Sequence, residues 1–317
     1  MRTAAMQNKA RGGSSRLVAA AKINLCLHIT GRQQSGDQQG FHTLDSLVVF
    51  AAIGDVVTTR LADAIELQVE GPMASALDEP VTDNLVYRAA VALSAHAGVQ
   101  TGARISLKKH LPVAAGIGGG SADAAATLRS LCTLWDLAPD DDDLNRIALS
   151  LGADVPVCLR GKASFMTGVG EHLKHAGPFP DTHLVLINPG VALSTAEVFK
   201  ALDDQSAASL PVDRSLFAHT FSEADELATA LKHCRNDLEV PASSLQPVIG
   251  NVLTSLSAQP GCLLARMSGS GASCFGLFAD ETSAVTGADQ IMFNQPDWWV
   301  VATRLVNDTD KLQELAA

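Results

Sequence analysis

Apolar residues along this chain follow two spacings, one typical of strands and the other typical of helices. From Ile23 to Ile29 every second residue is apolar, as in a β-strand with one covered face. From Leu128 to Trp135 apolar residues recur every three or four positions, as along one side of a helix. Read over the whole chain, these patterns predict strands at 17–29, 46–60, 64–70, 103–109, 155–174 and 183–187, a strand pair within 262–279, a last strand at 298–306, and helices at 84–97, 117–136, 142–151, 195–202, 222–234, 243–257 and 281–293. Because strands and helices mix in both halves, the pattern indicates an α+β fold.

The chain of 317 residues is long enough for about two domains. Turn-forming glycine and proline at 176–180 mark the best break, which predicts domains over 17–176 and 177–317. The segment 1–16 carries four basic residues and no acid, and only five apolar residues separate it from Lys22. Five residues are too few for the core of a signal peptide, so we expect 1–16 to be a disordered basic tail.

The composition excludes several classes of protein. Hydrophobic residues make up 47% of the chain and charged residues 18%, as in a folded globular protein. The net charge of −11 argues against a nucleic-acid partner, since phosphate backbones bind basic surfaces. The longest apolar run of the first half, 47–53, is far shorter than the ~20 residues of a membrane-spanning helix. We therefore expect neither nucleic acid nor membrane as a partner.

The six cysteines show no spacing typical of a metal site. They stand at positions 26, 132, 158, 234, 262 and 274, without a Cys-x-x-Cys pair. Cysteines that bind zinc usually come in closely spaced pairs, and disulfides belong to oxidising compartments. The spacing therefore favours reduced, buried thiols in a cytoplasmic protein over a zinc site.

The strongest local signal is a glycine-rich segment between a predicted strand and a predicted helix. Four glycines lie within 116–120, and Ser121 follows them. Free N–H groups and the positive dipole end of the helix favour an anion such as phosphate. The Walker motif would need Lys-Ser/Thr after the last glycine, and the dinucleotide motif would need Gly or Ala at Ser121. We expect a phosphate loop of a third kind; the alternative is a flexible turn, which would need only one or two glycines.

A second glycine cluster lies at 267–274, in the other half of the chain. Taken alone, glycines between two strands are typical of a bulge or a tight turn. Pockets form preferentially between domains, and the two clusters belong to different predicted domains. Together they therefore suggest a ligand between the two halves.

Lys22 and Asp154 are charged residues in apolar surroundings. Lys22 and Asn24 share the polar face of the first strand, and the run 17–21 before them is apolar on both faces. A covered lysine needs an anionic partner; the alternative is an ordinary solvent-facing strand edge. Asp154 follows a helix closed by Gly152 and opens an apolar strand, so it is either a functional carboxylate or a turn-forming aspartate.

Taken together, these segments resemble the GHMP small-molecule kinases. Residues 112–126 look like the family's phosphate loop, and 266–278 look like its glycine-rich third segment. Further matches stand at 21–25, 40–44, 83–85, 152–156, 168–171 and 235–239, and at 189–190 with Thr195 and Phe199, so that the resemblance covers about residues 17–306. It implies the two-domain GHMP fold, with an N-terminal domain like domain 2 of ribosomal protein S5 and a ferredoxin-like C-terminal domain.

Within this family, the segments are similar to those of kinases acting on a branched polyol linked to cytidine diphosphate. The resemblance implies ATP-dependent phosphorylation of a tertiary hydroxyl of that small molecule, on the non-mevalonate route to isoprenoid precursors. The cofactors would be ATP and Mg²⁺, for which Ser121 and Asp154 are candidate ligands only. Asp154 would be the catalytic base and Lys22 its partner.

The resemblance also implies two sets of binding residues. The ATP site would comprise Asn84, Lys109, Pro112, Val113, Ala114, Ala115, Gly116, Ile117, Gly118, Gly119, Gly120, Ser121 and Ala122. The substrate site would comprise Asn24, Phe41, His42, Thr195 and Phe199. Within it, Phe41 and Phe199 would lie on opposite faces of the cytosine ring.

Two other functions stay open at this point. One is a GHMP kinase for another small alcohol, such as mevalonate or homoserine. The other is a nucleotide-binding sensor that has kept the loop and lost catalysis, against which Lys22 and Asp154 argue. In each case we expect a small-molecule ligand and a cytoplasmic monomer or weak homodimer.

Overall fold

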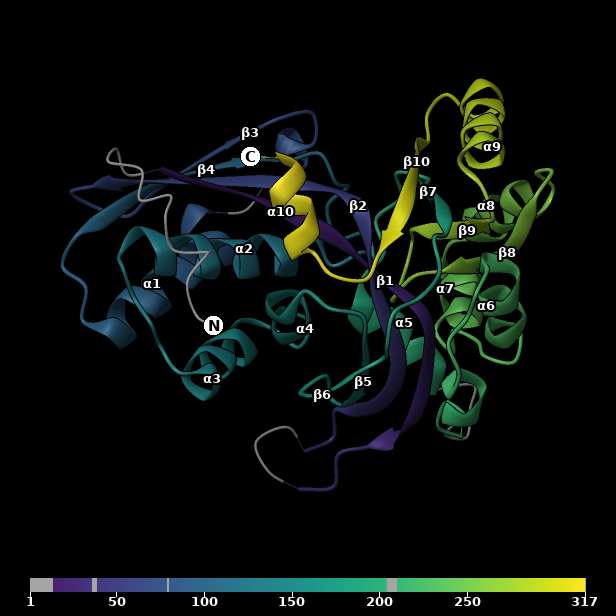
Figure 1. Cartoon of the computed structure of the whole chain (residues 1–317), viewed down its shortest axis with the longest axis horizontal. Coiled ribbons are helices and arrows are strands. Elements are labelled where there is room, and N and C mark those ends of the chain that lie inside the picture. The colour runs from purple at the N-terminus through teal and green to yellow at the C-terminus, as the bar shows by residue number, and fades with distance from the viewer. Residues whose placement is uncertain (1–13, 36–38, 79, 204–209, 317) are drawn as a thin grey trace.

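The computed structural model describes residues 14–35, 39–78, 80–203 and 210–316 (Figure 1). Its strands are β1 (Ser14–Arg32), β2 (His42–Ala62), β3 (Glu66–Glu70), β4 (Gly102–Lys108), β5 (Ser164–Gly168), β6 (His172–His175), β7 (His183–Asn188), β8 (Cys262–Met267), β9 (Cys274–Phe278) and β10 (Trp299–Val306). Its helices are α1 (Leu85–Ala97), α2 (Gly119–Leu134), α3 (Asp141–Leu151), α4 (Val155–Arg160), α5 (Thr195–Asp203), α6 (Ala224–Leu231), α7 (Glu239–Leu245), α8 (Val248–Ser257), α9 (Glu281–Asn294) and α10 (Asp310–Ala316), with 3₁₀ helices at Ala74–Ala76, Val81–Asp83 and Arg214–Phe217. The predicted α+β class is confirmed.

One connected sheet of ten strands runs through the described part of the chain. Its main path is β3-β4-β2-β10-β7-β9-β8, and β2 also pairs with β1 and β5. The long strand β2 joins the two halves, since its middle pairs with the end of β10 through Ala51–Leu305 and Phe50–Val306. The N-terminal and C-terminal strands are therefore held in one frame.

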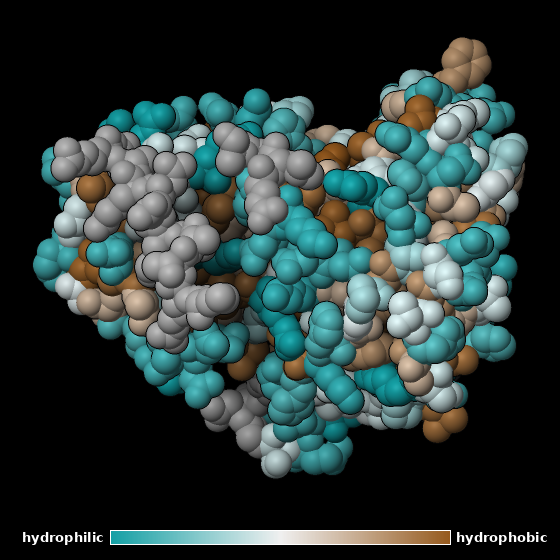
Figure 2. Space-filling view, viewed as in Figure 1, coloured by the Kyte–Doolittle hydropathy of each residue, from teal (hydrophilic) through white to brown (hydrophobic). Residues whose placement is uncertain are grey.

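Helices cover the sheet in two groups. In Figure 1, α2 packs along β1 and β2 with α1, α3 and α4 around it, while α8 and α9 pack on β7–β10. Figure 2 shows mainly hydrophilic side chains on the visible face, with hydrophobic ones gathered beside β10. Within the described ranges, no helix combines the length and the apolar character needed to cross a membrane.

The hydrophobic core is shared between the two halves. One buried cluster joins Leu25 and Leu111 to Leu184 and Phe275, which lie on the far side of the predicted domain break. Strand β1 contributes side chains to all three buried clusters. Because burial of apolar surface is the main stabilising contribution to folding, β1 is the element on which both halves depend. The division at residue 176 stays a prediction.

The two ends of the described chain differ from the sequence prediction. Strand β1 begins at Ser14, so residues 14–16, which we expected in the tail, pair with the far end of β2. Pairing with β2 gives the backbone of 14–16 its hydrogen-bond partners. The remainder of the predicted tail, 1–13, lies outside the described residues. Helix α10, which the apolar pattern did not predict, follows β10.

The predicted strand at 155–174 is wrong over its first residues. Residues Val155–Arg160 form helix α4, which has Pro156 in its first turn and ends at Gly161 with a φ of 63°. Proline suits the first turn of a helix, and glycine tolerates the left-handed conformation at its end. A short apolar run fits a buried helix as well as a buried strand, so spacing alone cannot decide between them.

The predicted helix at 243–257 is two helices. Helix α7 ends before Gln246, and α8 starts after Pro247. Proline pushes the residue before it out of the helical conformation, and Gln246 has a φ of −133° and a ψ of 87°. The chain therefore changes direction at this point.

Candidate active site

Lys22 on β1 and Asp154 before α4 form an ion pair. Nζ of Lys22 lies 2.7 Å from Oδ2 of Asp154. The side chain of Lys22 is 3% exposed and that of Asp154 is 34% exposed. The prediction that Lys22 is covered and has an anionic partner is confirmed. Asp154 is the N-cap of α4 and does not open a strand, so that part of the prediction is wrong.

Backbone hydrogen bonds tie the glycine-rich loop before α2 to strand β1. The N–H of Lys22 donates to the carbonyl oxygen of Ile117 at 2.9 Å. The hydroxyl of Ser268 donates to the carbonyl of Gly116 at 3.0 Å and accepts the N–H of Asn24 at 3.1 Å. The loop is therefore fixed to the strand that carries Lys22 and Asn24 and to the second glycine cluster.

The two glycine clusters touch backbone to backbone. Gly116 has a φ of 74°, and a Cβ there would lie 2.5 Å from the carbonyl oxygen of Ser268. A Cβ on Gly269 would lie 2.6 Å from the carbonyl oxygen of Gly116. Only glycine permits such an approach. The second cluster thus supports the first by direct contact, and the expected ligand between the halves stays a prediction.

The first turn of α2 lies beside the Lys22–Asp154 pair. Gly118 is the N-cap, and a Cβ there would lie 3.0 Å from Cβ of Lys22. The first N–H groups of a helix have no partner within the helix, and they form its positive end. A cation, a helix N-terminus and a half-exposed carboxylate thus meet in one place. This arrangement can hold a phosphate group next to a hydroxyl group.

The predicted ATP-binding segment alternates between anchoring and accessible residues. Its buried members are Pro112, Ala115, Ile117 and Ala122, and its accessible members are Val113, Ala114, Gly116, Gly118, Gly119, Gly120 and Ser121. Burial of the first set fixes the loop on the core, which leaves the second set free to meet a ligand. This division fits a phosphate loop better than it fits a flexible turn.

Asn24 is fully buried below the site. Its Nδ2 donates to the hydroxyl of Ser46 at 2.8 Å, and that hydroxyl donates to the carbonyl of Cys26 at 2.6 Å. Within the described residues, no donor reaches Oδ1 of Asn24. A buried oxygen without a donor costs free energy that a ligand hydroxyl would recover. The expected contact of Asn24 with substrate stays a prediction.

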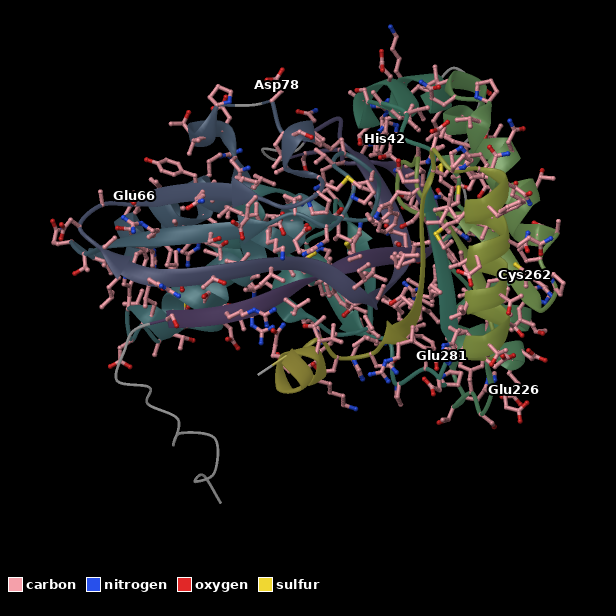
Figure 3. The ribbon with its side chains drawn as sticks, turned by 90° about the horizontal axis from the view of Figure 1, so that it is seen from above. His42, Glu66, Asp78, Glu226, Cys262 and Glu281 are labelled. Atoms are coloured by element: carbon pink, nitrogen blue, oxygen red, sulfur yellow. The ribbon has the colours of Figure 1, made fainter. Side chains whose placement is uncertain are left out.

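His42, at the start of β2, stacks on Phe199 of α5. Their ring centroids lie 4.7 Å apart at an angle of 25°. Nε2 of His42 lies 2.8 Å from Oδ1 of Asp203, and Arg32 also pairs with that carboxylate. Slight burial would raise the pKa of the Asp203 carboxyl. Hydrogen bonds from Arg32 and His42 outweigh this effect and lower that pKa. In Figure 3, His42 lies close to the C-terminal half of the protein.

The expected pairing of Phe41 with Phe199 differs from what the structure shows. Phe41 is 62% exposed at the end of the β1–β2 hairpin, and His42 covers the ring of Phe199 instead. Successive residues of a strand point to opposite faces, so Phe41 and His42 cannot both face Phe199. Thr195 lies apart from them at the start of α5, with its Oγ1 2.8 Å from Oγ of Ser270 in the second glycine cluster.

Asn84 and Lys109, the two residues expected beside adenosine, make internal contacts. Oδ1 of Asn84 accepts the N–H of Val86 at 2.9 Å and so caps helix α1. Nζ of Lys109 lies 2.5 Å from Asp55 and 2.8 Å from Asp123, with only 3% of the side chain exposed. The ammonium group of Lys109 therefore faces carboxylates inside the protein. That Asn84 and Lys109 border the adenosine of ATP stays a prediction.

The buried triad Asp55–Lys109–Asp123 lies under the phosphate loop. A Cβ on Gly119 would lie 3.5 Å from Nζ of Lys109. Asp55 also accepts the N–H of Leu111 at 2.9 Å, whereas Oδ1 of Asp123 has no partner among the described residues. Burial raises the pKa of Asp123 to about 8, against the opposing charge of Lys109. Two carboxylates share one ammonium group, and Asp123, which has fewer hydrogen-bond donors than Asp55, is the carboxyl that keeps a proton.

Sequence reasoning missed several residues that support the site. Asp55 is recognisable in the sequence, because it is an acid within an apolar strand. Asn236, whose Nδ2 donates to the carbonyls of Met267 and Gly269, lies in a matched segment but was given no role. Asp203 offered no local signal at all.

Comparisons with known proteins agree with this geometry. Residues 84–162 match the GHMP kinases N terminal domain, and residues 214–294 match the GHMP kinases C terminal domain. A protein of Rhodospirillum rubrum named 4-diphosphocytidyl-2-C-methyl-D-erythritol kinase is 49% identical over 294 residues, with 93% of each chain covered. The chain belongs to the 4-diphosphocytidyl-2-C-methyl-D-erythritol kinase family of GHMP kinases.

Further members of this family and solved structures agree. A kinase of the same name from Cereibacter sphaeroides is 51% identical over 290 residues, covering 91% of this chain and 98% of the relative. A crystal structure of 4-(cytidine 5'-diphospho)-2C-methyl-D-erythritol kinase aligns with a TM-score of 0.74 at 31% identity, covering 92% and 99% of the two chains. A homoserine kinase from Cytophaga hutchinsonii, at 18% identity and a TM-score of 0.69, shares the fold. The predicted GHMP kinase fold is confirmed.

Proposed function

We propose that this chain is an ATP-dependent kinase that phosphorylates the 2-hydroxyl of 4-diphosphocytidyl-2-C-methyl-D-erythritol, in the biosynthesis of isoprenoid precursors. The observation that carries the proposal is the 2.7 Å contact between Lys22 and Asp154 beside the N-terminus of α2. Relatives at about half identity that bear the name of this kinase support the choice of substrate.

ATP binds with its phosphates over the glycine-rich loop. The accessible backbone of Gly118, Gly119 and Gly120 presents N–H groups at the positive end of α2. Leu85, at the start of α1, lies near Gly120, so the nucleoside extends toward that helix. This orientation brings the terminal phosphate toward Lys22 and Asp154.

The residues present fit a Mg²⁺ ion carried in with ATP. Ser121 supplies a hydroxyl oxygen at the first turn of α2, and Asp154 supplies a half-exposed carboxylate. Oxygen donors of this kind, completed by phosphate oxygens and water, are what Mg²⁺ prefers. When bound, the ion neutralises charge on the transferred phosphate.

Asp154 orients the acceptor hydroxyl and takes its proton, and Lys22 stabilises the charge that develops beside it. Phosphoryl transfer depends mainly on positioning and charge neutralisation, so little covalent work falls on the protein. A lysine about 4 Å from the acceptor oxygen contributes roughly 4 kcal/mol at an effective dielectric constant near 20, before desolvation costs. Because Lys22 is buried and Asp154 is not, the hydroxyl approaches the carboxylate.

The cytidine end of the substrate binds at the His42–Phe199 stack. Phe199 offers one aromatic face, and His42 offers a ring whose position Asp203 fixes. Stacking of a base on an aromatic ring contributes about 1–3 kcal/mol. Phe41 covers the second face of the base only if the hairpin turns inward, and Asn24 and Thr195 face the polyol and diphosphate between the two ends.

The test is ADP release from ATP with three acceptors: 4-diphosphocytidyl-2-C-methyl-D-erythritol, mevalonate and homoserine. The proposal expects release with the first acceptor alone. Release of ADP with mevalonate or homoserine instead would leave the fold assignment standing and contradict the proposed substrate. No release with any acceptor, despite ATP binding, would favour a nucleotide sensor. We further propose a monomer or weak homodimer that works in the cytoplasm, where ATP is available.

A further inference from the structure

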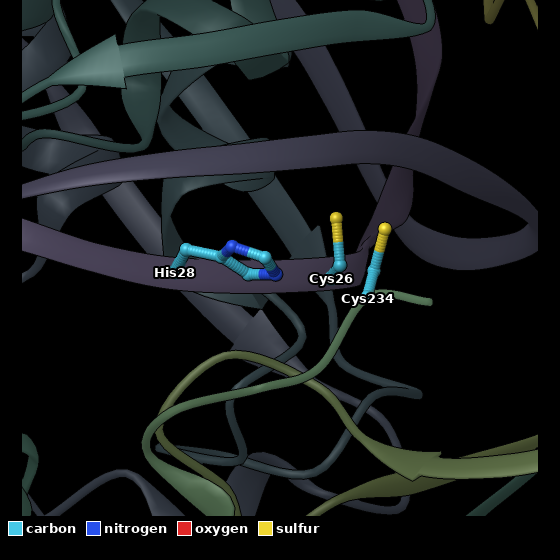
Figure 4. Close-up of side chains that lie close together, drawn as sticks. All are labelled: Cys26, His28 and Cys234. Carbon is cyan, nitrogen blue, oxygen red and sulfur yellow. The ribbon is translucent and has the colours of Figure 1, made fainter. Parts of the chain in front are cut away.

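Cys26 and His28 of β1 meet Cys234, which lies far away in sequence, inside the protein. Sγ of Cys26, Sγ of Cys234 and a ring nitrogen of His28 all lie within 4.8 Å of one another (Figure 4). All three residues are buried, with 0%, 5% and 5% of their surface exposed. Spacing in the sequence argued against a zinc site, but it could not show that β1 and the segment after α6 lie side by side.

The imidazole of His28 is oriented toward the two sulfur atoms. Its Nδ1 lies 2.9 Å from the carbonyl oxygen of Leu210, which fixes the N–H on Nδ1 and leaves the lone pair on Nε2. A histidine that binds a metal typically donates its other N–H to a backbone carbonyl or a carboxylate in this way. The N–H of Arg235 now occupies the Nε2 side at a long 3.2 Å, and a metal ion would displace that weak contact.

The backbone around the three side chains is held firmly. Leu27 donates to the carbonyl of Arg235 at 2.9 Å and accepts the N–H of Asp237 at 2.8 Å, which locks β1 to the segment after α6. The buried guanidinium of Arg266 donates to the carbonyls of Leu25 and Cys234. A donor set held by rigid elements is preorganised for a ligand.

We propose that Cys26, His28 and Cys234 form a binding site for Zn²⁺. Two thiolates and one imidazole nitrogen are ligands that zinc prefers, and three protein ligands leave a fourth position for water. Binding releases the two thiol protons to solvent, and no bond of the protein backbone breaks. The ion would join β1 to the C-terminal half directly.

The site is separate from the catalytic pair but connected to the substrate site. The carbonyl of Cys26 accepts the hydroxyl of Ser46, which in turn accepts Nδ2 of Asn24. A metal ion on Cys26 would therefore hold Asn24 in place as well. The alternative is a disulfide between Cys26 and Cys234. A disulfide would not explain why the imidazole of His28 is oriented toward the two sulfur atoms.

The test uses the full-length chain with its affinity tag removed. After exposure to zinc chloride and gel filtration, we expect about one zinc ion per chain. With cobalt chloride instead, we expect the intense near-ultraviolet absorption of thiolate ligands and visible bands of a tetrahedral ion. Zinc should also raise the thermal midpoint, and magnesium at the same concentration should not.

Variants assign the site. Cys234→Ser and His28→Gln should lose the bound zinc, whereas Cys262→Ser, a half-buried cysteine on β8 outside the cluster, should keep it. Wild-type protein that holds no zinc after exposure to zinc chloride would overturn the proposal. An unchanged zinc content in Cys234→Ser would overturn it as well. So would a wild-type chain that is lighter by two hydrogens and carries a Cys26–Cys234 disulfide. If a variant does not fold, the cobalt spectrum of the wild-type protein decides by itself.

Discussion

The ammonium nitrogen of Lys22 lies 2.7 Å from Oδ2 of Asp154, although 132 positions separate the two residues. The two partners differ in exposure, at 3% for Lys22 and 34% for Asp154. An acceptor hydroxyl can therefore reach the carboxylate from solvent, while the ammonium group acts from behind it. This asymmetry supports the proposal that Asp154 takes the proton and Lys22 stabilises the developing charge.

Asp154→Asn should lower kcat by about 10²–10⁴, since the amide keeps the size of the side chain but cannot accept the proton. ATP should still bind, because the loop before α2 stays intact. Steady-state kinetics with the cytidyl substrate measures kcat. Asp142→Asn, which changes an exposed acid of α3, is the matched control. Turnover of Asp154→Asn at the parent rate would remove Asp154 from the reaction.

Phe199→Ala should raise the KM for the cytidyl substrate about 5- to 150-fold, which corresponds to the ~1–3 kcal/mol of one stacked base. The KM for ATP should stay at the parent value, because Phe199 lies at the other end of the site. Phe293→Ala, at a phenylalanine that is 87% exposed on α9, controls for loss of an aromatic side chain. If both variants bind substrate like the parent, the cytosine does not stack on Phe199.

Gly116→Ala should destabilise the protein more than Gly177→Ala does. Both glycines have a positive φ, 74° and 76°, so each substitution carries a conformational cost of about 1–2 kcal/mol. A Cβ at Gly116 would also overlap the carbonyl oxygen of Ser268, whereas nothing lies within 4 Å of one at Gly177. Urea unfolding measures the difference. Equal midpoints for the two variants would contradict the close contact between the glycine clusters.

Stability should fall as pH rises toward alkaline values because of Asp123. Burial raises its pKa to about 8 in the folded protein, whereas an unfolded aspartate releases its proton near pH 4. Between these values the folded chain binds the extra proton, so this contribution is full below pH ~4 and is lost as pH passes ~8, at up to about 1.4 kcal/mol per pH unit.

Asp123→Asn isolates that contribution, because the amide next to Lys109 does not titrate. The difference in unfolding free energy between parent and variant should shift in favour of the variant from pH 5 to pH 9. Asp297→Asn, at an exposed acid, should follow the parent throughout. A constant difference between parent and Asp123→Asn would mean that Asp123 is ionised over the whole range.

Much of the site was readable from the sequence because its signals are local. Glycines before an apolar helix indicate an N-terminus open to an anion, and the apolar run before Lys22 indicates a covered lysine. The same local reasoning mistook α4 for a strand, since a short apolar run satisfies either structure.

Pairings between distant segments could not be read in this way. The sequence by itself determined most helices and strands, the glycine-rich loop before α2 and the need of Lys22 for an anion, because periodicity, glycine and charge act over a few neighbouring residues. The tertiary structure decided that Asp154 is that anion, that His42 rather than Phe41 covers Phe199, that Lys109 faces two carboxylates, and that Cys26 meets Cys234. Such contacts depend on the register of β1 against β2 and on the packing of α4, α5 and α6 around them, and long-range packing leaves no periodic trace in the chain.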